Sequence, residues 1–273
     1  MDVETKAPIK VDRAQAAQLC SAWVRSLKDL ERSVAKCRRK LSEPRVHDLR
    51  LACRGCVPVL ELMHELHPRD ATWRTARRLV KGIGKALGPL RDAQVCQLLL
   101  KEGKSKDRRI LMTKARKEER LLRPSVEAAL DLVGRLPADA VRDVFRSDTP
   151  ARFEELSVAI SRLLARRTVR LKQYRAAMRL SDTASVHRAR IALKWYRYLL
   201  LALEPCLTAT QLRRLRALKV VQDTLGEQHD ADLFRAWLKS TQGLSALPDA
   251  EFRSDQRRDR AKVRRMLDRE WTL

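Results

Sequence analysis

The sequence predicts an all-α protein that is built from a duplicated helical unit. Apolar residues recur at helical spacing along most of the chain, and no stretch shows the strict alternation of a half-buried β-strand. Two short motifs also occur twice, in the same order and at nearly the same separation, which is typical of an internal repeat. Because each periodic segment reads as a helix, packing of helix on helix is the expected architecture.

Charge is the strongest feature of the composition. The chain has 273 residues, with 59 Lys and Arg against 34 Asp and Glu, which gives a formal net charge of +25. A compact fold with this excess repels itself, so a polyanionic partner is expected. The chain has no run of about eighteen apolar residues, and its first ten residues hold no hydrophobic signal core. We therefore expect a cytoplasmic protein with no membrane insertion.

Residues 185–205 show the helical pattern most clearly. Their basic side chains fall at i, i+3, i+7 and i+10 and therefore form one stripe along a helix. The stripe consists of His187, Arg190, Lys194 and Arg197. Apolar residues form the opposite face, as in a helix packed on a core. A solvated face usually mixes acids with bases, whereas this stripe is purely basic and about 15 Å long, so phosphates spaced along a polyanion could meet it in register.

The same pattern occurs 140 residues earlier in the chain. There His47, Arg50 and Arg54 take the places of the first three residues of the stripe. A second motif follows each copy, with LGPLRD at residues 87–92 and LGEQHD at residues 225–230. Two motifs repeated at nearly equal separations indicate a duplicated unit of about half the chain.

These motifs resemble the CHAD family, the conserved-histidine α-helical domain. The pattern is V-H-x-x-R-x-x-x-[RK] leading into an apolar helix, and then L-G-x-x-[RH]-D about forty residues later. The resemblance covers about residues 11–271. It implies two four-helix bundles related by pseudo-twofold symmetry, whose basic residues line a groove or pore that binds inorganic polyphosphate. It also implies that the protein is not an enzyme. The first copy departs from the second, because Gly55 and Val57 stand where the second has Trp195 and Arg197, which shortens the first ladder.

The duplication divides the chain near its midpoint, where Gly134, Pro137 and Pro150 mark a linker. We expect a flexible tail at residues 1–10, a first bundle at 11–136, the linker at 137–149 and a second bundle at 150–273. The helices expected in the first bundle are 11–41, 44–68, 70–100 and 104–136, the last of which is kinked or restarted near Pro124. Those expected in the second bundle are 150–180, 182–203, 208–238 and 249–271, with a turn at 243–248.

A second basic ladder is expected on the helix 70–100. The ladder consists of Arg74, Arg78, Lys81 and Lys85, which lie within about 60° of one another around the helix axis. Asp92 lies on the same side of the helix. An acid in that position can orient Arg or His by a charge-assisted hydrogen bond. Asp230 takes the same place in the second half. Gly88 and Gly226, within the LG motifs, are interpreted as allowing close approach, either of helix to helix or of backbone to phosphate, with close helix packing as the favoured cause.

We therefore expect noncatalytic binding of inorganic polyphosphate, with polyphosphate granules as a candidate location. The contacts expected in the first bundle are His47, Arg50, Arg54, Arg74, Arg78, Lys81, Lys85 and Arg91. Those expected in the second bundle are His187, Arg190, Lys194, Arg197, Arg213, Arg216, Lys219 and His229. Asp92 and Asp230 are expected to orient their neighbours. A secondary candidate cluster consists of Arg38, Arg39, Arg166, Arg167 and Arg170.

The recurrence of histidine at the head of both ladders predicts that His47 and His187 contact phosphate. A protonated histidine donates hydrogen bonds, and a neighbouring polyanion favours the charged form. Binding is therefore expected to strengthen below about pH 6.5, the ordinary pKa of histidine.

Two other functions stay open on the sequence alone. Charge by itself would also support nonspecific binding of nucleic acid, although aromatic residues are only 4% of the chain and no helix-turn-helix is recognisable. A metal-dependent phosphohydrolase is less favoured, because Asp48 of the His47–Asp48 pair becomes Arg188 in the second copy. Two cysteines and two histidines at residues 53–67 would lie along about 20 Å of one helix, too far apart to surround one zinc ion. No metal or cofactor is expected.

Overall fold

The computed structural model describes residues 9–102, 107–146, 149–242, 261 and 263–267. Every regular element among these residues is a helix, so the predicted all-α class is confirmed. The elements are α1 (Arg13–Arg39), α2 (Glu43–Leu66), α3 (Ala71–Glu102), α4 (Arg108–Asp131), α5 (Ala138–Val144), α6 (Pro150–Ala176), α7 (Thr183–Ala202), the short 3₁₀ turn η1 (Glu204–Cys206) and α8 (Ala209–Gln242).

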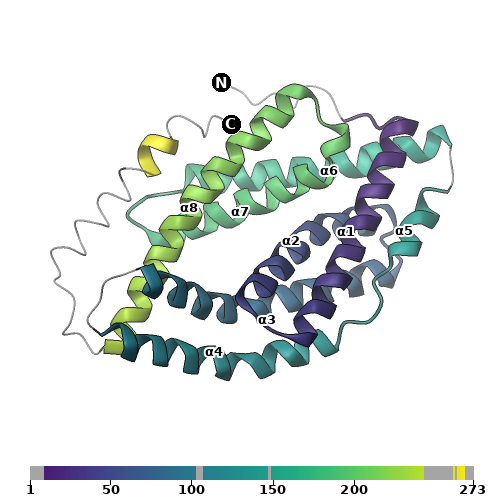
Figure 1. Ribbon diagram of the computed structural model, residues 1–273. Coiled ribbons are helices and arrows are strands. Elements are labelled where there is room, and N and C mark those ends of the chain that lie inside the picture. Colours follow the sequence, from purple (N-terminus) through teal and green to yellow (C-terminus); the bar gives the residue numbers. More distant parts are fainter. Residues whose placement is uncertain (1–8, 103–106, 147–148, 243–260, 262, 268–273) are drawn as a thin grey trace.

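Helix α2 lies at the centre of the arrangement. It packs against α1 and α3 and also against α6 and α7 from the second half of the chain. In that half α6 packs on α7 and α7 on α8, and α8 also reaches α3 (Figure 1). The two halves therefore meet along α2 and α7, the helices that carry the repeated V-H-x-x-R motif. A duplicated pair of four-helix bundles stays a prediction, because most of the last expected helix falls outside the described residues.

Local sequence signals define both the start and the buried face of α1. Asp12 caps the helix in a capping box, since its Oδ1 accepts from the Gln15 backbone N at 2.8 Å and Gln15 Oε1 accepts from the Asp12 backbone N at 3.1 Å. Leu19 and Trp23, one turn apart, are fully buried. Trp23 Nε1 donates to the carbonyl oxygen of Ala202 at 2.7 Å. Helix α1 therefore holds the C-terminal end of α7, the helix that carries the longer basic stripe.

The segment expected as a linker contains the short helix α5, which packs against α1. Ala138 and Val141 are buried there, and the ring of Phe145 meets that of Trp23 edge-on at 5.6 Å between centroids. Seven residues are too few to show a clear helical period in the sequence. Helix α4 continues through Pro124 and does not restart there. Residues 1–8, the expected turn at 243–248 and most of the expected helix 249–271 lie outside the described residues.

The far end of α8 packs against α3 and α4, where Leu100, Leu111 and Leu238 form a small apolar cluster. Trp237 Nε1 donates to Glu118 Oε2 at 2.6 Å across the same contact. Helix α8 is thus attached at one end to α7 and at the other to the first half of the chain (Figure 1). Of the helices in the described ranges, none combines the length and the apolar character needed to cross a bilayer.

Candidate functional site

Charged residues of both repeated motifs gather where α2, α3, α7 and α8 meet. Their charges lie close enough to shift one another's pKa: Arg54 of α2 acts on both Arg190 and Lys194 of α7, and Arg190 acts on Arg50 and Asp92. We call this group the central cluster. It consists of His47, Arg50, Arg54, Arg91, Asp92, His187, Arg190, Lys194, His229 and Asp230.

Lys194 is a buried cation with other cations around it, and its pKa is lowered as a result. Burial lowers the pKa of Lys194 to about 7, and the positive charges of Arg54, Arg190 and Arg50 add to that decrease. Burial likewise lowers the pKa of Arg50 to about 10, with Arg54 contributing in the same direction. An anion bound among these cations would reduce the electrostatic repulsion between them.

Each arginine of the V-H-x-x-R motif lies beside the LG motif of its own half. Arg50 Nη1 donates to the carbonyl oxygens of Leu87 and Gly88 at 3.0 and 3.1 Å. In the second half, a methyl group on Gly226 would lie 3.9 Å from Arg190 Nη2, which is ordinary contact. The two repeated motifs therefore lie together in one site, and in the first half the helix backbone of the LG motif positions Arg50.

This arrangement corrects the interpretation of Gly88. A methyl group on Gly88 would meet no atom of another described element within 4 Å, so close packing of a second helix does not require glycine there. The carbonyl of Gly88 faces Arg50 instead. The LG motif thus contributes its backbone to the site.

The two aspartates lie next to the arginines in corresponding positions. Burial lowers the pKa of both Arg50 and Arg190; Asp92 opposes that decrease at Arg50, and Asp230 opposes it at Arg190. Burial raises the pKa of Asp92, although Arg50 and His229 act in the opposite direction. Asp92 and Asp230 also repel each other, so the two halves of the site are in electrostatic contact.

Histidines from α7 and α8 form a pair at the same place. The rings of His187 and His229 are 5.2 Å apart between centroids. Desolvation lowers the pKa of His187, and His229, Arg190 and Lys194 add to this effect. His229 Nδ1 and Arg190 Nε are both buried without a hydrogen-bond partner among the described residues. An acceptor oxygen that reached Arg190 Nε would complete its hydrogen bonding. His229 Nδ1, which lies 3.7 Å from Asp230 Oδ1, would donate as well when it carries a proton.

The other predicted contacts are exposed or make other interactions. Arg74, Arg78 and Lys85 are exposed on α3, and Arg213 and Arg216 are exposed on α8. Lys219 Nζ pairs with Asp223 Oδ2 at 2.6 Å on the same helix. Arg197 Nη1 donates to Gln222 Oε1 at 3.4 Å. Within the central cluster, Arg91 also pairs with Glu43 of α2. Contact of these residues with polyphosphate stays a prediction.

The secondary candidate cluster is dispersed over the molecule. Arg38 Nη2 donates to the carbonyl oxygens of Leu130 and Val133 at 2.7 and 2.8 Å, so it caps the end of α4. The Arg170 guanidinium lies 5.6 Å from the ring of Tyr174, and Arg39 is exposed. Arg166 and Arg167 instead pair with acids of α2.

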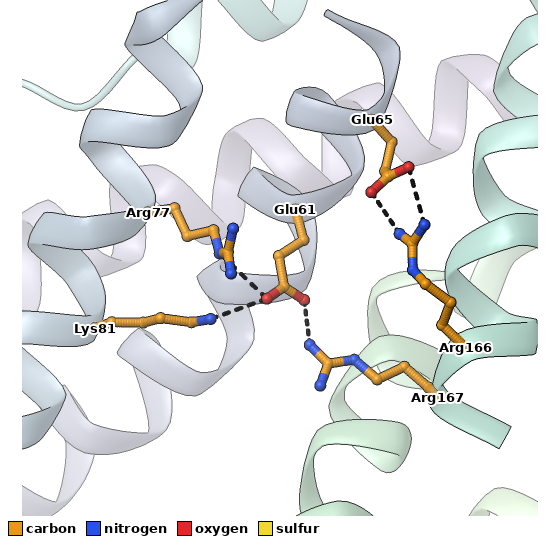
Figure 2. A network of polar contacts seen from close by, with 6 residues as sticks. All are labelled: Glu61, Glu65, Arg77, Lys81, Arg166 and Arg167. Atoms are coloured by element: carbon orange, nitrogen blue, oxygen red, sulfur yellow. Dashed lines mark hydrogen bonds and ion pairs between the residues drawn. The ribbon is translucent and has the colours of Figure 1, made fainter. Parts of the chain in front are cut away.

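A buried acid on α2 binds three cations at once (Figure 2). Glu61 is 7% exposed, and its Oε1 lies 3.0 Å from Lys81 Nζ and 3.3 Å from Arg77 Nε, while its Oε2 pairs with Arg167 of α6. We call these four residues the Glu61 network. Glu61 and Arg77 are not among the residues that the sequence predicts for the site. An acid inside the apolar run VLELM is the signal that could have identified them, because a buried carboxylate requires cationic partners.

Trp195 connects the Glu61 network with the central cluster. Lys81 Nζ and the Arg167 guanidinium each lie 5.9 Å from the centroid of its ring, and Lys194 Nζ lies 5.7 Å from it. Cations at this distance are attracted by the ring quadrupole. The basic residues of the Glu61 network and those of the central cluster therefore adjoin each other at Trp195.

Comparison with known proteins agrees with the fold and the motifs. The chain is similar to the crystal structure of the CHAD domain from the plant Ricinus communis, with a TM-score of 0.60, 19% identity, and coverage of 92% of this chain and 86% of that one. It is also similar to PptA from Streptomyces chartreusis, with a TM-score of 0.55, 16% identity, and coverage of 94% and 98%. A search of the curated proteins found no match. The family model of the CHAD domain matches residues 19–239, and the chain therefore belongs to the CHAD domain family.

Proposed function

We propose that this protein binds inorganic polyphosphate at the central cluster and does not catalyse a reaction on it. The observation that carries the proposal is the convergence of five cations from three helices, Arg50, Arg54, Arg91, Arg190 and Lys194, against the three carboxylates Asp92, Asp230 and Glu43, the last of which pairs with Arg91. The pKa of Lys194 supports it, because burial is the main cause of its decrease and the positive charges of Arg54, Arg190 and Arg50 add to that decrease. The noncatalytic part rests on the family resemblance.

The chemistry of the cluster favours polyphosphate over nucleic acid. Polyphosphate offers only backbone charge, which arginine and lysine recognise without any contact to a base. Single-stranded nucleic acid is usually held by bases stacked on aromatic faces. The aromatic ring next to the cluster, that of Trp195, has three cations close to it. It is therefore better placed to position those cations than to stack on a base.

A competition experiment tests the proposal. Labelled long-chain polyphosphate at a fixed concentration is challenged with duplex DNA, RNA and tripolyphosphate at about 150 mM salt. We expect long-chain polyphosphate to win by at least about tenfold per charge, which corresponds to about 1.4 kcal/mol. Orthophosphate release in the same samples, with and without Mg²⁺, is expected to stay at background. Equal competition by DNA or RNA would make the cluster a generic basic surface, and release of phosphate would make the protein an enzyme.

The affinity for polyphosphate is expected to fall as the pH rises from about 7 to 9. Well below pH 7 Lys194 is charged in both the free and the bound protein, so its contribution to affinity is largest there. Above pH 7 the free protein loses this proton and must regain it on binding, which weakens affinity by up to about tenfold per pH unit. Burial and nearby positive charge also lower the pKa of His47 and His187. The expected gain from histidine protonation therefore begins below the ordinary value of about 6.5.

Two lysine-to-arginine variants isolate the contribution of Lys194. Lys194→Arg keeps a charge that does not titrate in this range, so its affinity is expected to stay level between pH 7 and 9. Lys172→Arg makes the same change on an exposed residue of α6 and is expected to behave like the wild type. Titration of binding at constant salt is the measurement. A decrease that persists in Lys194→Arg would assign the pH dependence to another group.

A further inference from the structure

The Glu61 network holds more positive charge than its single acid can neutralise. One carboxylate faces Arg77, Lys81 and Arg167, so the group carries two positive charges in excess (Figure 2). The neighbouring pair on α2 is balanced, because Glu65 meets only Arg166 in the same view. One cation is enough to neutralise one carboxylate, so the charge of Glu61 does not by itself require the other two cations.

The acid lies deep and the cations reach outward from it. The side chain of Glu61 is 8% exposed, whereas those of Arg77 and Lys81 are 35% and 39% exposed and that of Arg167 is 16% exposed. Burial acts to raise the pKa of Glu61, but Arg167 and Lys81 outweigh it, and the pKa lies below its usual value. The carboxylate is thus ionised at neutral pH. The buried Glu61 carboxylate therefore pairs with three cations whose side chains are partly exposed to solvent.

The network continues the central cluster along the same helix. Glu61 follows Arg54 by seven residues on α2, which places it two turns, or about 10 Å, further along. Trp195 has Lys194 of the central cluster near its ring together with Lys81 and Arg167 of the network. A linear polyanion that leaves the central cluster along α2 therefore meets these cations next.

We propose that Arg77, Lys81 and Arg167 form a second phosphate subsite for polyphosphate, and that Glu61 is a built-in counter-anion that positions these cations and limits their affinity. The inference rests on the proposed function, since it extends the same bound chain. Glu61 orients the cations when the subsite is empty. Its negative charge remains below a bound phosphate and repels it, so the subsite binds more weakly than its three cations would alone.

Neutralising Glu61 is the first test. Glu61→Gln keeps the size of the side chain and removes its charge, so it is expected to raise the affinity for long-chain polyphosphate about tenfold at constant salt. Glu65→Gln removes the same charge one turn along α2, where the pairing is one to one, and is expected to change affinity less than twofold. Equal effects of the two variants, or weaker binding by Glu61→Gln, would overturn the role of Glu61.

Thermal unfolding separates this role from a purely structural one. Glu61→Gln leaves three cations without their acid, so its melting temperature without ligand is expected to fall. Saturating polyphosphate is then expected to raise the melting temperature more in Glu61→Gln than in the wild type, because the ligand binds more tightly to the folded variant. If the variant lost stability and polyphosphate raised its melting temperature no more than that of the wild type, Glu61 would be a structural anchor only.

Lys81→Gln tests the subsite without disturbing the acid, which keeps Arg77 and Arg167 as partners. We expect affinity to fall about fivefold and the slope of log affinity against log salt to decrease by about one. Lys101→Gln, on an exposed residue at the end of the same helix, is the control and is expected to change affinity less than twofold. Similar effects of the two variants would remove the subsite. A wild type that shows no preference for polyphosphate would instead remove the proposed function itself.

Discussion

Replacing both Arg190 and Lys194 with glutamate is expected to weaken the binding of long-chain polyphosphate at least about a hundredfold at 150 mM salt. Hydrogen bonds to charged groups contribute about 1.5–3 kcal/mol each, so losing two of them costs about 3 kcal/mol or more. The new carboxylates also repel the ligand next to Arg54, which lies beside both positions. Arg190 Nε is buried without a hydrogen-bond partner among the described residues, so a hydrogen bond from this atom to phosphate would be lost as well in the variant.

A matched control separates the cluster from the overall charge of +25. Arg108→Glu combined with Arg109→Glu makes the same change of net charge at the exposed start of α4. We expect this variant to lose less than about fivefold in affinity. Circular dichroism and thermal unfolding of both double variants check that each is folded. Comparable losses in the two would show that binding depends on total charge and not on the central cluster.

Trp23→Ala is expected to lower the free energy of unfolding by about 3–5 kcal/mol. The indole is 1% exposed, packs edge-on against Phe145 and donates its only hydrogen bond to the carbonyl oxygen of Ala202. Its removal therefore leaves a cavity at α1 and an unpaired carbonyl at the end of α7. Because a domain is stable by only about 5–15 kcal/mol, this single change takes a large part of the total.

Urea or guanidinium unfolding measures this loss, and Trp23→Phe serves as the graded comparison. Phenylalanine keeps most of the buried ring but cannot donate to Ala202, so its expected loss is smaller, about 1–2 kcal/mol. A Trp23→Ala protein within 1 kcal/mol of the wild type would contradict the position of this ring in the core.

The helices and the central cluster could be predicted from local pattern. The spacing of His187, Arg190 and Lys194 requires only the period of an α-helix, and it holds as long as the segment is helical. The second copy on α2 and the LG motifs added the information that these segments belong together. Their convergence at one place follows from the packing of α2 on α7 and of α3 on α8.

The rest depended on contacts between residues distant in the sequence. The ladder on α3 is predicted only from the angles of its residues around the helix axis. In the structure Lys81 pairs with Glu61 of α2, and Arg167 of α6 pairs with the same acid. Nothing in the local sequence of α3 or α6 indicates these partners. Gly88 was interpreted through helix packing because the sequence does not show that Arg50 bonds to its carbonyl. Periodicity identifies a face of a helix, but tertiary packing decides what meets it.

The position of the central cluster has a consequence for the lifetime of the protein. Mutually repelling cations occupy the packing of α2 on α7, which is where the two halves of the chain are held together. An anion that binds there and prefers the folded chain would stabilise it, by up to about 2.7 kcal/mol at a free concentration one hundred times its Kd. Chains without ligand then open more often to proteases than loaded ones. The cellular amount of this protein would therefore follow the supply of its ligand without any change in gene expression.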